Sequence, residues 1–407
     1  MTLTAVPAEQ NVVPARLRRR LLPLWAATFL QAVGFWVPVE KLFMAEIGFD
    51  AATVGVMAAA YAALVPVAEV ISGVLADRWS RRGVLMVAGV ALLTSVAVGA
   101  LSHNVVTYIV AALILGIYFA MYSGTVEAIV YDVVLEETGD SAAYERQIGR
   151  VRLIESIALV SSALIGGWIA SALTPRATYL LTLPFAALYL IVLTRFREPT
   201  LHRTEVRTTL RSHLTVTYRA ITDGGRLIPI AAATLMGAMI LQAMFEFGPL
   251  WLVELKASAV YYGPFWALLV GTLGIGGLLA HRLRLDRLVA VVLVVVTMVA
   301  ACLVMTTSHN LTLLTAAMVA LAFLLVVIGI HLSQLLHDAV PSSIRTGVAS
   351  GVSALSWVVF TPFALVFGAL TKRVGVYTSG WMITGAVAVA GLALIWVQRN
   401  AHRTALR

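Results

Sequence analysis

The chain alternates along its whole length between long apolar runs and short polar segments, most of them basic. Each run is close to the roughly 20 residues that an α-helix needs to cross a bilayer. The runs are continuous and lack the period-2 alternation of membrane β-strands. The expected fold class is therefore an all-α membrane protein. The pattern predicts twelve transmembrane helices, at residues 21–44, 52–76, 83–101, 105–133, 150–172, 177–194, 228–253, 261–280, 287–307, 311–335, 346–370 and 377–397.

These helices divide six and six around a polar segment that contains seven arginines. We therefore expect an N-terminal six-helix half at residues 1–194, a cytoplasmic basic linker at 195–227 and a C-terminal six-helix half at 228–407. Within the linker, residues 210–221 are compatible with a short helix at the membrane surface and equally with a solvated connection.

Short sequence matches relate the two halves. The hexapeptide GVLADR at 73–78 corresponds to GLLAHR at 277–282, and the triplet Leu-Gln-Ala at 30–32 recurs at 241–243. Each triplet is followed six residues later by a proline. An even number of crossings returns the chain to the same side, so the halves run parallel. Parallel six-helix halves are one architecture of secondary transporters.

The distribution of positive charge predicts the orientation. Of the 29 lysines and arginines, 24 fall in segments that would be cytoplasmic if the N-terminus is inside. This asymmetry follows the positive-inside rule and predicts both termini in the cytoplasm, with the chain in the inner (plasma) membrane. The net charge of +9 then reflects insertion into the lipid bilayer, and no nucleic-acid partner is implied. The five outer basic residues are Lys41, Arg176, Lys256, Lys372 and Arg373, and we expect Lys41 to snorkel to the interface.

Composition excludes several classes of protein. Charged residues make up 12% of the chain, against about 25% in ordinary soluble domains. The single cysteine, Cys302, rules out a disulfide framework and is expected to be a buried hydrophobe. The sequence has no nucleophile elbow, metal cluster or phosphate-binding loop, so we expect no enzyme activity, catalytic residue, metal or cofactor. The energy source must then be an ion gradient or the gradient of the substrate.

Residues 73–82, GVLADRWSRR, resemble the signature between helices 2 and 3 of the major facilitator superfamily, G-x-L-a-D-r-x-G-r-K/R. Ser80 stands where that signature has its second glycine, and His281 replaces the aspartate in the degenerate copy of the second half. Segments 123–132 and 338–345 resemble helix 4 and the loop after helix 10 of bacterial drug-efflux-like members. The resemblance covers the whole chain and implies the major facilitator fold and a transport function.

The resemblance also implies a gating latch that joins the two halves at the cytoplasmic side in the outward-facing state. A role in anchoring the topology alone is the alternative. The antiporter signature of helix 5 survives only as Gly166-Gly167, which weakens the prediction of antiport. The latch residues are Gly73, Asp77, Arg78, Arg81 and Arg82.

Glu246 is the most deeply placed charge, a little past the middle of its predicted helix. Gln242 lies one turn earlier, so both side chains share a face. Their counterparts in the first half are Phe35 and Gln31, and helices 1 and 7 line the central cavity in the family. Charges at this depth cost at least about 2.5–3.5 kcal/mol and are functional candidates by default. We therefore predict a substrate or proton site formed by Gln31, Phe35, Gln242 and Glu246, with a hydrogen-bonded structural glutamate as the alternative reading of Glu246.

A second group of charges lies near the cytoplasmic ends of helices 2, 4 and 5. Glu69 and Glu127 belong to the first two of these helices, and Arg152 and Glu155 are i,i+3 neighbours in the third. Their spacing predicts a charge network. Structural pairing and a gating or proton-relay role are both compatible with it.

The function that these features favour is secondary active transport by alternating access. The expected activity is efflux of a small apolar or cationic compound, a drug or secondary metabolite, in exchange for protons by a monomer. An importer or symporter of a small metabolite is the alternative mechanism. A non-transporting membrane sensor or scaffold is the alternative of another class.

Overall fold

The computed structural model describes residues 15–122, 124–139, 143–199, 227–283, 285, 287–338 and 345–405. Every regular element in these ranges is a helix, and eleven of the helices are long and apolar enough to cross a membrane. Residues 200–226 lie outside the described ranges, so the predicted surface segment at 210–221 and the limits of the linker remain predictions. Some side chains within the helices are not described, among them those of 73, 74, 76–78, 281, 337–338 and 345–347.

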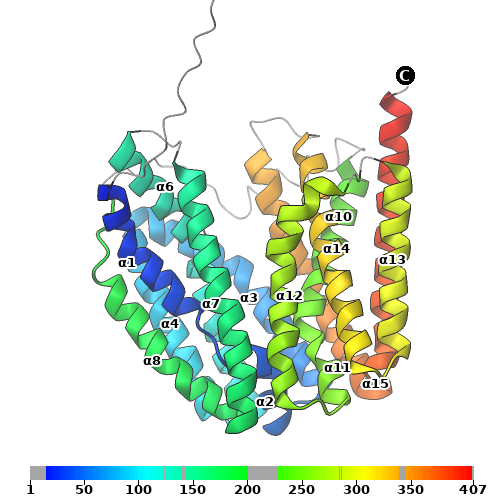
Figure 1. Ribbon diagram of the computed structural model, residues 1–407, viewed down its shortest axis with the longest axis horizontal. Coiled ribbons are helices and arrows are strands. Elements are labelled where there is room, and N and C mark those ends of the chain that lie inside the picture. Colours follow the sequence, from blue (N-terminus) through cyan, green and yellow to red (C-terminus); the bar gives the residue numbers. More distant parts are fainter. Residues whose placement is uncertain are drawn as a thin grey trace, which may run out of the picture.

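The helices form two bundles that stand side by side (Figure 1). The first bundle consists of α1 (Ala15–Ala32), η1 (Val37–Val39), α2 (Glu40–Glu46), α3 (Ala51–Arg78), α4 (Arg81–Leu101), α5 (Val105–Tyr122), α6 (Thr125–Thr138), α7 (Tyr144–Ala172) and α8 (Pro175–Leu193). The second consists of α10 (Leu227–Phe247), α11 (Pro249–Glu254), α12 (Ala259–Leu279), η2 (Ala280–Arg282), α13 (Leu288–Thr307), α14 (Leu311–Asp338) and α15 (Arg345–Ala405).

The last element, α15, is two helices joined at a sharp bend. A straight helix of 61 residues would be about 90 Å long, three times the roughly 30 Å of hydrocarbon in a bilayer. Its backbone leaves the helical region at Gly375, where φ is +81°, a conformation that glycine adopts without strain. With this bend, the eleven candidate spans correspond to the twelve crossings that the hydrophobic pattern predicts.

Three of the predicted helices are broken, which corrects the expectation of continuous helices there. The first ends at Ala32 and resumes as η1 and α2, and the seventh is interrupted at Gly248 between α10 and α11. The prolines that follow the repeated triplets, Pro38 and Pro249, open the second segments, because proline lacks an N–H for the preceding turn. The fourth helix is broken at Gly124, where φ is +30°. The breaks in the first and seventh helices thus occupy equivalent positions of the repeat.

The two bundles pack most closely at the end of the molecule opposite the described chain ends (Figure 1). Here α3 contacts α15 and α7 contacts α12. A Cβ on Gly167 would lie 2.7 Å from the backbone nitrogen of Gly263, and a Cβ on Gly368 would lie 2.9 Å from Cα of Gly55. Glycines allow backbones of membrane helices to approach in this way. We call this region, defined by these four glycines, the closed end.

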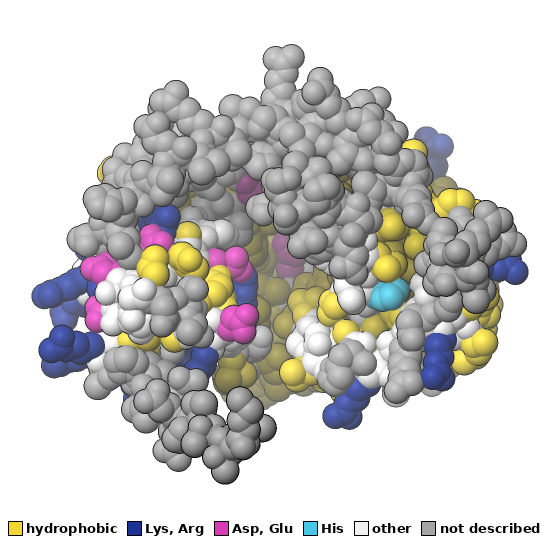
Figure 2. Space-filling view, turned by 90° about the horizontal axis from the view of Figure 1, so that it is seen from above, with side chains coloured by type: hydrophobic (Ala, Val, Ile, Leu, Met, Phe, Trp, Pro, Cys, Tyr) yellow, Lys and Arg dark blue, Asp and Glu magenta, His cyan; other side chains and the backbone are white. Residues whose placement is uncertain are grey.

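The opposite face carries the start of α1 and the end of α15, and we call it the terminal face (Figure 1). Figure 2 looks down on it and shows a hollow between the two bundles, with apolar side chains along its visible depth. Acidic side chains gather on the first bundle beside this hollow. The molecule is therefore closed at one end and open at the other.

Candidate functional site

The charged side chain buried deepest at the closed end is Lys41, on α2, with a relative exposure of 3%. Its Nζ lies 2.5 Å from Oε1 of Glu246, on α10 of the other bundle, and 3.0 Å from Oε2 of Glu40. The expectation that Lys41 snorkels to the interface is therefore wrong. A buried carboxylate partner is available across the bundle boundary, so the ammonium points inward.

Glu40 is held by tyrosines of the first bundle. The hydroxyl of Tyr108, on α5, donates to Oε1 of Glu40 at 3.0 Å, and it also lies 2.6 Å from the hydroxyl of Tyr179, on α8. The ring of Tyr179 is stacked on Trp36 with centroids 5.2 Å apart. This packing fixes the position of Glu40. We call the group of Glu40, Lys41, Tyr108, Tyr179 and Glu246 the closed-end cluster.

The closed-end cluster holds one ammonium between two carboxylates. With all three ionised its formal charge is −1. Removing one member of a buried ion pair typically costs about 3–5 kcal/mol, because the other charge is left uncompensated. The Lys41–Glu246 contact therefore ties the two bundles together as long as both groups are charged.

The structure separates the other predicted substrate-path residues. Gln31 is buried within the first bundle, where its Nε2 donates to the Tyr122 hydroxyl at 2.9 Å and its Oε1 accepts from the Tyr118 hydroxyl. Phe35 packs edge-on against Phe185 of α8, with ring centroids 5.5 Å apart. In the described residues, neither side chain has a hydrogen bond or ion pair with Glu246. Only Gln242 shares a helix face with it, one turn away on α10, and is half-buried.

The predicted charge network forms in part. Arg152, on α7, lies 2.5 Å from Glu127 of α6 and 3.2 Å from Glu155 of its own helix. Glu69, on α3, is exposed and has no ionic partner among the described residues. The first bundle thus presents this partly exposed group toward the terminal face. In the described residues, no set of three His, Cys, Asp or Glu side chains is placed to hold a metal ion.

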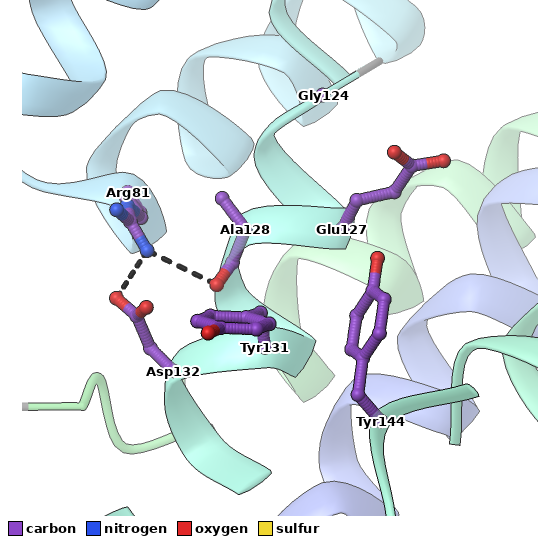
Figure 3. A pocket seen from close by; sticks show the side chains of 7 residues that line it. All are labelled: Arg81, Gly124, Glu127, Ala128, Tyr131, Asp132 and Tyr144. Atoms are coloured by element: carbon purple, nitrogen blue, oxygen red, sulfur yellow. Dashed lines mark hydrogen bonds and ion pairs between the residues drawn. The ribbon is translucent and has the colours of Figure 1, made fainter. Parts of the chain in front are cut away.

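A cavity of about 480 Å³ lies beside this network, within the first bundle (Figure 3). At one side of it Arg81 donates to Asp132 and to the carbonyl oxygen of Ala128, the latter at 3.0 Å. Glu127 and Tyr144 lie on the other side (Figure 3). Arg81 was predicted in the latch, and Asp132 was noted only as the end of the segment that resembles helix 4, so their pairing had no local signal in the sequence.

Comparison with known proteins identifies the family. The sequence model described as Major Facilitator Superfamily matches residues 24–358, most of the chain. The chain belongs to the major facilitator superfamily. A comparison with curated protein sequences gave no match.

Solved structures of several transporters are similar in fold. The nucleoside transporter NupG is 14% identical with a TM-score of 0.75, over 94% of this chain and 98% of that one. A bacterial homologue of the lysosomal transporter Spinster, in an inward-facing conformation, is 13% identical with a TM-score of 0.72, over 95% and 98% of the chains. The D-xylose–proton symporter is 13% identical with a TM-score of 0.66, over 92% and 97%. At such identities the likeness supports the fold alone.

The major facilitator signature, which begins in the last turns of α3, is described in part. Gly73, Asp77 and Arg78 belong to the last turns of α3, but their side chains lie outside the described residues. Arg81 is paired as above, and Nη2 of Arg82 donates to the carbonyl oxygen of Thr194 at 3.0 Å. Within the described part, the two latch arginines bind the first bundle alone, and the latch role remains a prediction.

Ser80, which replaces the second glycine of the superfamily signature, caps α4. Its φ is −166°, an extended conformation that needs no glycine, and its Oγ accepts from the backbone N–H of Gly83 at 2.8 Å. Glu198 accepts from the Ser80 hydroxyl at 2.5 Å and from the Arg81 N–H at 2.6 Å. A serine shortly before a predicted helix is an N-cap signal. Glu198, however, lies 118 residues away and has no such signal.

Another group on the terminal side repeats the charge pattern of the closed-end cluster. Arg20, on α1, pairs with Glu136 at 3.0 Å and with Glu137 at 2.6 Å, both on α6. One cation is again shared by two carboxylates. Sequence spacing did not suggest this contact, since the partners are 116 and 117 residues apart.

Proposed function

We propose that this major facilitator protein exports a small apolar or cationic compound in exchange for protons, by alternating access. The observation that carries the proposal is the position of Glu246: a carboxylate of the second bundle that is paired, at the closed end, with an ammonium of the first. The distribution of basic residues supports an orientation in which the terminal face, and with it the hollow, lies on the cytoplasmic side of a bacterial inner membrane.

The physical argument concerns what happens to Glu246 when the closed end opens. Separation of the bundles removes Lys41 from its 2.5 Å contact and leaves a carboxylate without its cation inside the membrane. An uncompensated charge there costs at least about 2.5–3.5 kcal/mol, and burial without a partner favours the protonated form. A proton taken up in the outward-open state and released as Lys41 returns would couple the cycle to the proton gradient.

Aromatic side chains on α10 and α12 and at the bundle boundary support a lipophilic cargo. Phe245, the neighbouring residue on α10, lies with its ring centroid 5.7 Å from that of Trp266 on α12. Tyr61 of α3 and Trp357 of α15 meet edge to face across the bundle boundary, with centroids 5.9 Å apart. Aromatic faces attract organic cations as well as apolar groups.

Import or symport of a small metabolite is the second candidate. A proton symporter is among the proteins of similar fold, and the antiporter signature of helix 5 is reduced to two glycines. Both glycines have a packing role: a Cβ on Gly166 would lie 2.1 Å from the carbonyl oxygen of Phe35, and Gly167 approaches Gly263. They are therefore required by this fold whatever the direction of transport. A non-transporting sensor or scaffold is disfavoured by membership of a transporter superfamily.

The test uses inverted membrane vesicles and a cargo found by screening growth against a panel of toxic compounds. Cargo-induced proton release should be lost in Glu246→Gln and kept in Glu254→Gln, a matched control at the exposed end of α11. Import by symport would instead move protons and cargo in the same direction. Unchanged coupling in Glu246→Gln would rule out Glu246 as the proton-coupling group.

A further inference from the structure

We propose that Lys41 is a gating and specificity-determining residue, whose ammonium competes with the cationic group of the cargo for Glu246. The inference rests on the proposed function, because it assumes that cargo reaches Glu246 from the hollow. It goes further by assigning the cargo an ammonium group and by giving Lys41 and Glu40 distinct roles in opening the closed end.

The two groups of the Lys41–Glu246 ion pair differ in accessibility. The side chain of Lys41 is 2% exposed, whereas that of Glu246 is 18% exposed. Of the two groups, the carboxylate is therefore the more accessible to a cation. An amine that binds Glu246 takes the place of Lys41 and removes the ion pair that joins the bundles.

The closed-end cluster contains two carboxylates for one ammonium. Lys41 loses only one of its partners when Glu246 binds a different cation, since Glu40 remains 3.0 Å away on the same helix segment. Glu40 is itself fixed by the Tyr108 hydroxyl. The displaced ammonium thus keeps a buried counter-ion, and the cost of an orphaned charge is avoided. Glu40 acts as a positioning residue that makes the exchange reversible.

The charges of the closed-end cluster determine which charge the cargo must carry. A neutral cargo cannot replace Lys41 on Glu246, because it leaves that carboxylate unpaired. An anionic cargo would be drawn to Lys41, but Lys41 is shielded and lies between two negative charges. Only a cation preserves the charge balance of the closed-end cluster while it frees the second bundle. The aromatic pairs Phe245–Trp266 and Tyr61–Trp357 favour an amine with an apolar body.

A second ion pair across the bundles provides a matched control. Lys372 of α15 lies 2.8 Å from Asp50, which precedes α3, but both side chains are exposed, by 59% and 39%. Exposed pairs contribute about 0–1 kcal/mol. Lys372 also lacks a second carboxylate in the described residues, so its removal should leave the closed end in place.

The experiment follows the width of the closed end in full-length protein in lipid nanodiscs. Spin labels at His103→Cys and Leu313→Cys, both exposed and on different bundles, report the distance after Cys302→Ser removes the native thiol. Lys41→Ala should shift the population from the short to the long distance by about 5- to 150-fold, the usual range of coupling between sites. Lys372→Ala should keep the short distance.

Chemical rescue tests the competition itself. Propylammonium replaces the atoms that Lys41→Ala deletes, so it fits the space they leave between Glu40 and Glu246. There it pairs with both carboxylates as the Lys41 ammonium does, and it should restore the short distance, whereas 1-propanol should not. In the wild-type background phenethylammonium should widen the closed end by displacing Lys41. A short distance retained in Lys41→Ala would overturn the inference, as would equal effects of propylammonium and 1-propanol.

A fallback variant covers the case in which Lys41→Ala does not fold. The double variant Lys41→Met/Glu246→Gln removes both charges of the pair, so neither substitution leaves the charge of the other residue unpaired between the bundles. Phenethylammonium should fail to change its label distance, and widening equal to that of the wild-type background would refute the competition. Loss of proton coupling in Glu246→Gln tests the proposed function separately, since the distance measurements require no transport.

Discussion

The close approach of α7 and α12 makes a sharp prediction about Gly263→Ala. A Cβ at this position would lie 2.6 Å from the carbonyl oxygen of Ala163 and 3.2 Å from Cα of Leu164. Real Cβ atoms essentially never come within 3.0 Å of a heavy atom in a neighbouring helix, so the two helices must separate by at least 0.4 Å. The obstacle is backbone, which cannot rotate away as a flexible side chain can.

The expected cost follows from overpacking. Forcing an extra methyl group into a close-packed contact typically costs about 1–3 kcal/mol. This penalty applies only to the state in which the closed end is shut. Gly263→Ala should therefore lower the population of that state, relative to the open one, by about 5- to 150-fold.

The assay is the label distance across the closed end described above. Gly271→Ala, two turns further along α12, is the matched control, because a Cβ there meets nothing within 4 Å. It should leave the distance distribution unchanged. If Gly263→Ala gives the same short distance as Gly271→Ala, the closed end is not held by backbone contact, and the reasoning from these glycines fails.

Three further predictions concern the closed end and the superfamily signature. Ser80→Ala should destabilise detergent-purified protein by about 0.5–2 kcal/mol through loss of the α4 cap, and Ser80→Gly by only a few tenths, measured by thermal unfolding. Asp77→Asn should reduce transport with little loss of cargo binding, and normal turnover would contradict the latch. The Lys372 ammonium and the Thr53 N–H lower the pKa of Asp50 from 3.8 to about 2. Stabilisation from a lowered pKa is lost only as the pH falls through that value, so Asp50→Asn should leave the pH profile of the label distance unchanged between pH 8 and 5.

The order and number of crossings could be predicted because the bilayer imposes a length on every apolar run. The breaks at Pro38 and Pro249 were visible as a repeat but were not predicted as breaks. Membrane helices tolerate proline when neighbouring groups form hydrogen bonds with the backbone groups that it leaves unpaired. A proline in the sequence therefore does not by itself predict a helix break. The bend at Gly375 falls between the two final helices that were predicted at 346–370 and 377–397, so the hydrophobic pattern was sufficient to separate them.

The only part of the candidate site that could be predicted from the sequence is the residue that stands out by its depth in the membrane. Glu246 stood out because a carboxylate is rare in the middle of an apolar helix. Its partner was misjudged, since Lys41 lies near a helix end, where lysines usually reach water. The two residues are 205 positions apart, and no spacing rule joins them. Likewise the repeat matched Gln31 to Gln242, although the Gln31 amide forms hydrogen bonds with tyrosines of its own bundle.

The break between α1 and α2 has a mechanical consequence. Lys41 belongs to a seven-residue helix that is connected to α1 through a short 3₁₀ turn, whereas Glu246 ends a helix of 21 residues. The break in the second bundle comes after Glu246, so the carboxylate moves with the main body of α10. The ammonium thus lies on a short helix that the break separates from α1 and that Glu40 links to α5 through the Tyr108 hydroxyl. Opening of the closed end therefore moves α2 with the rest of the first bundle, and the ion pair separates between the bundles.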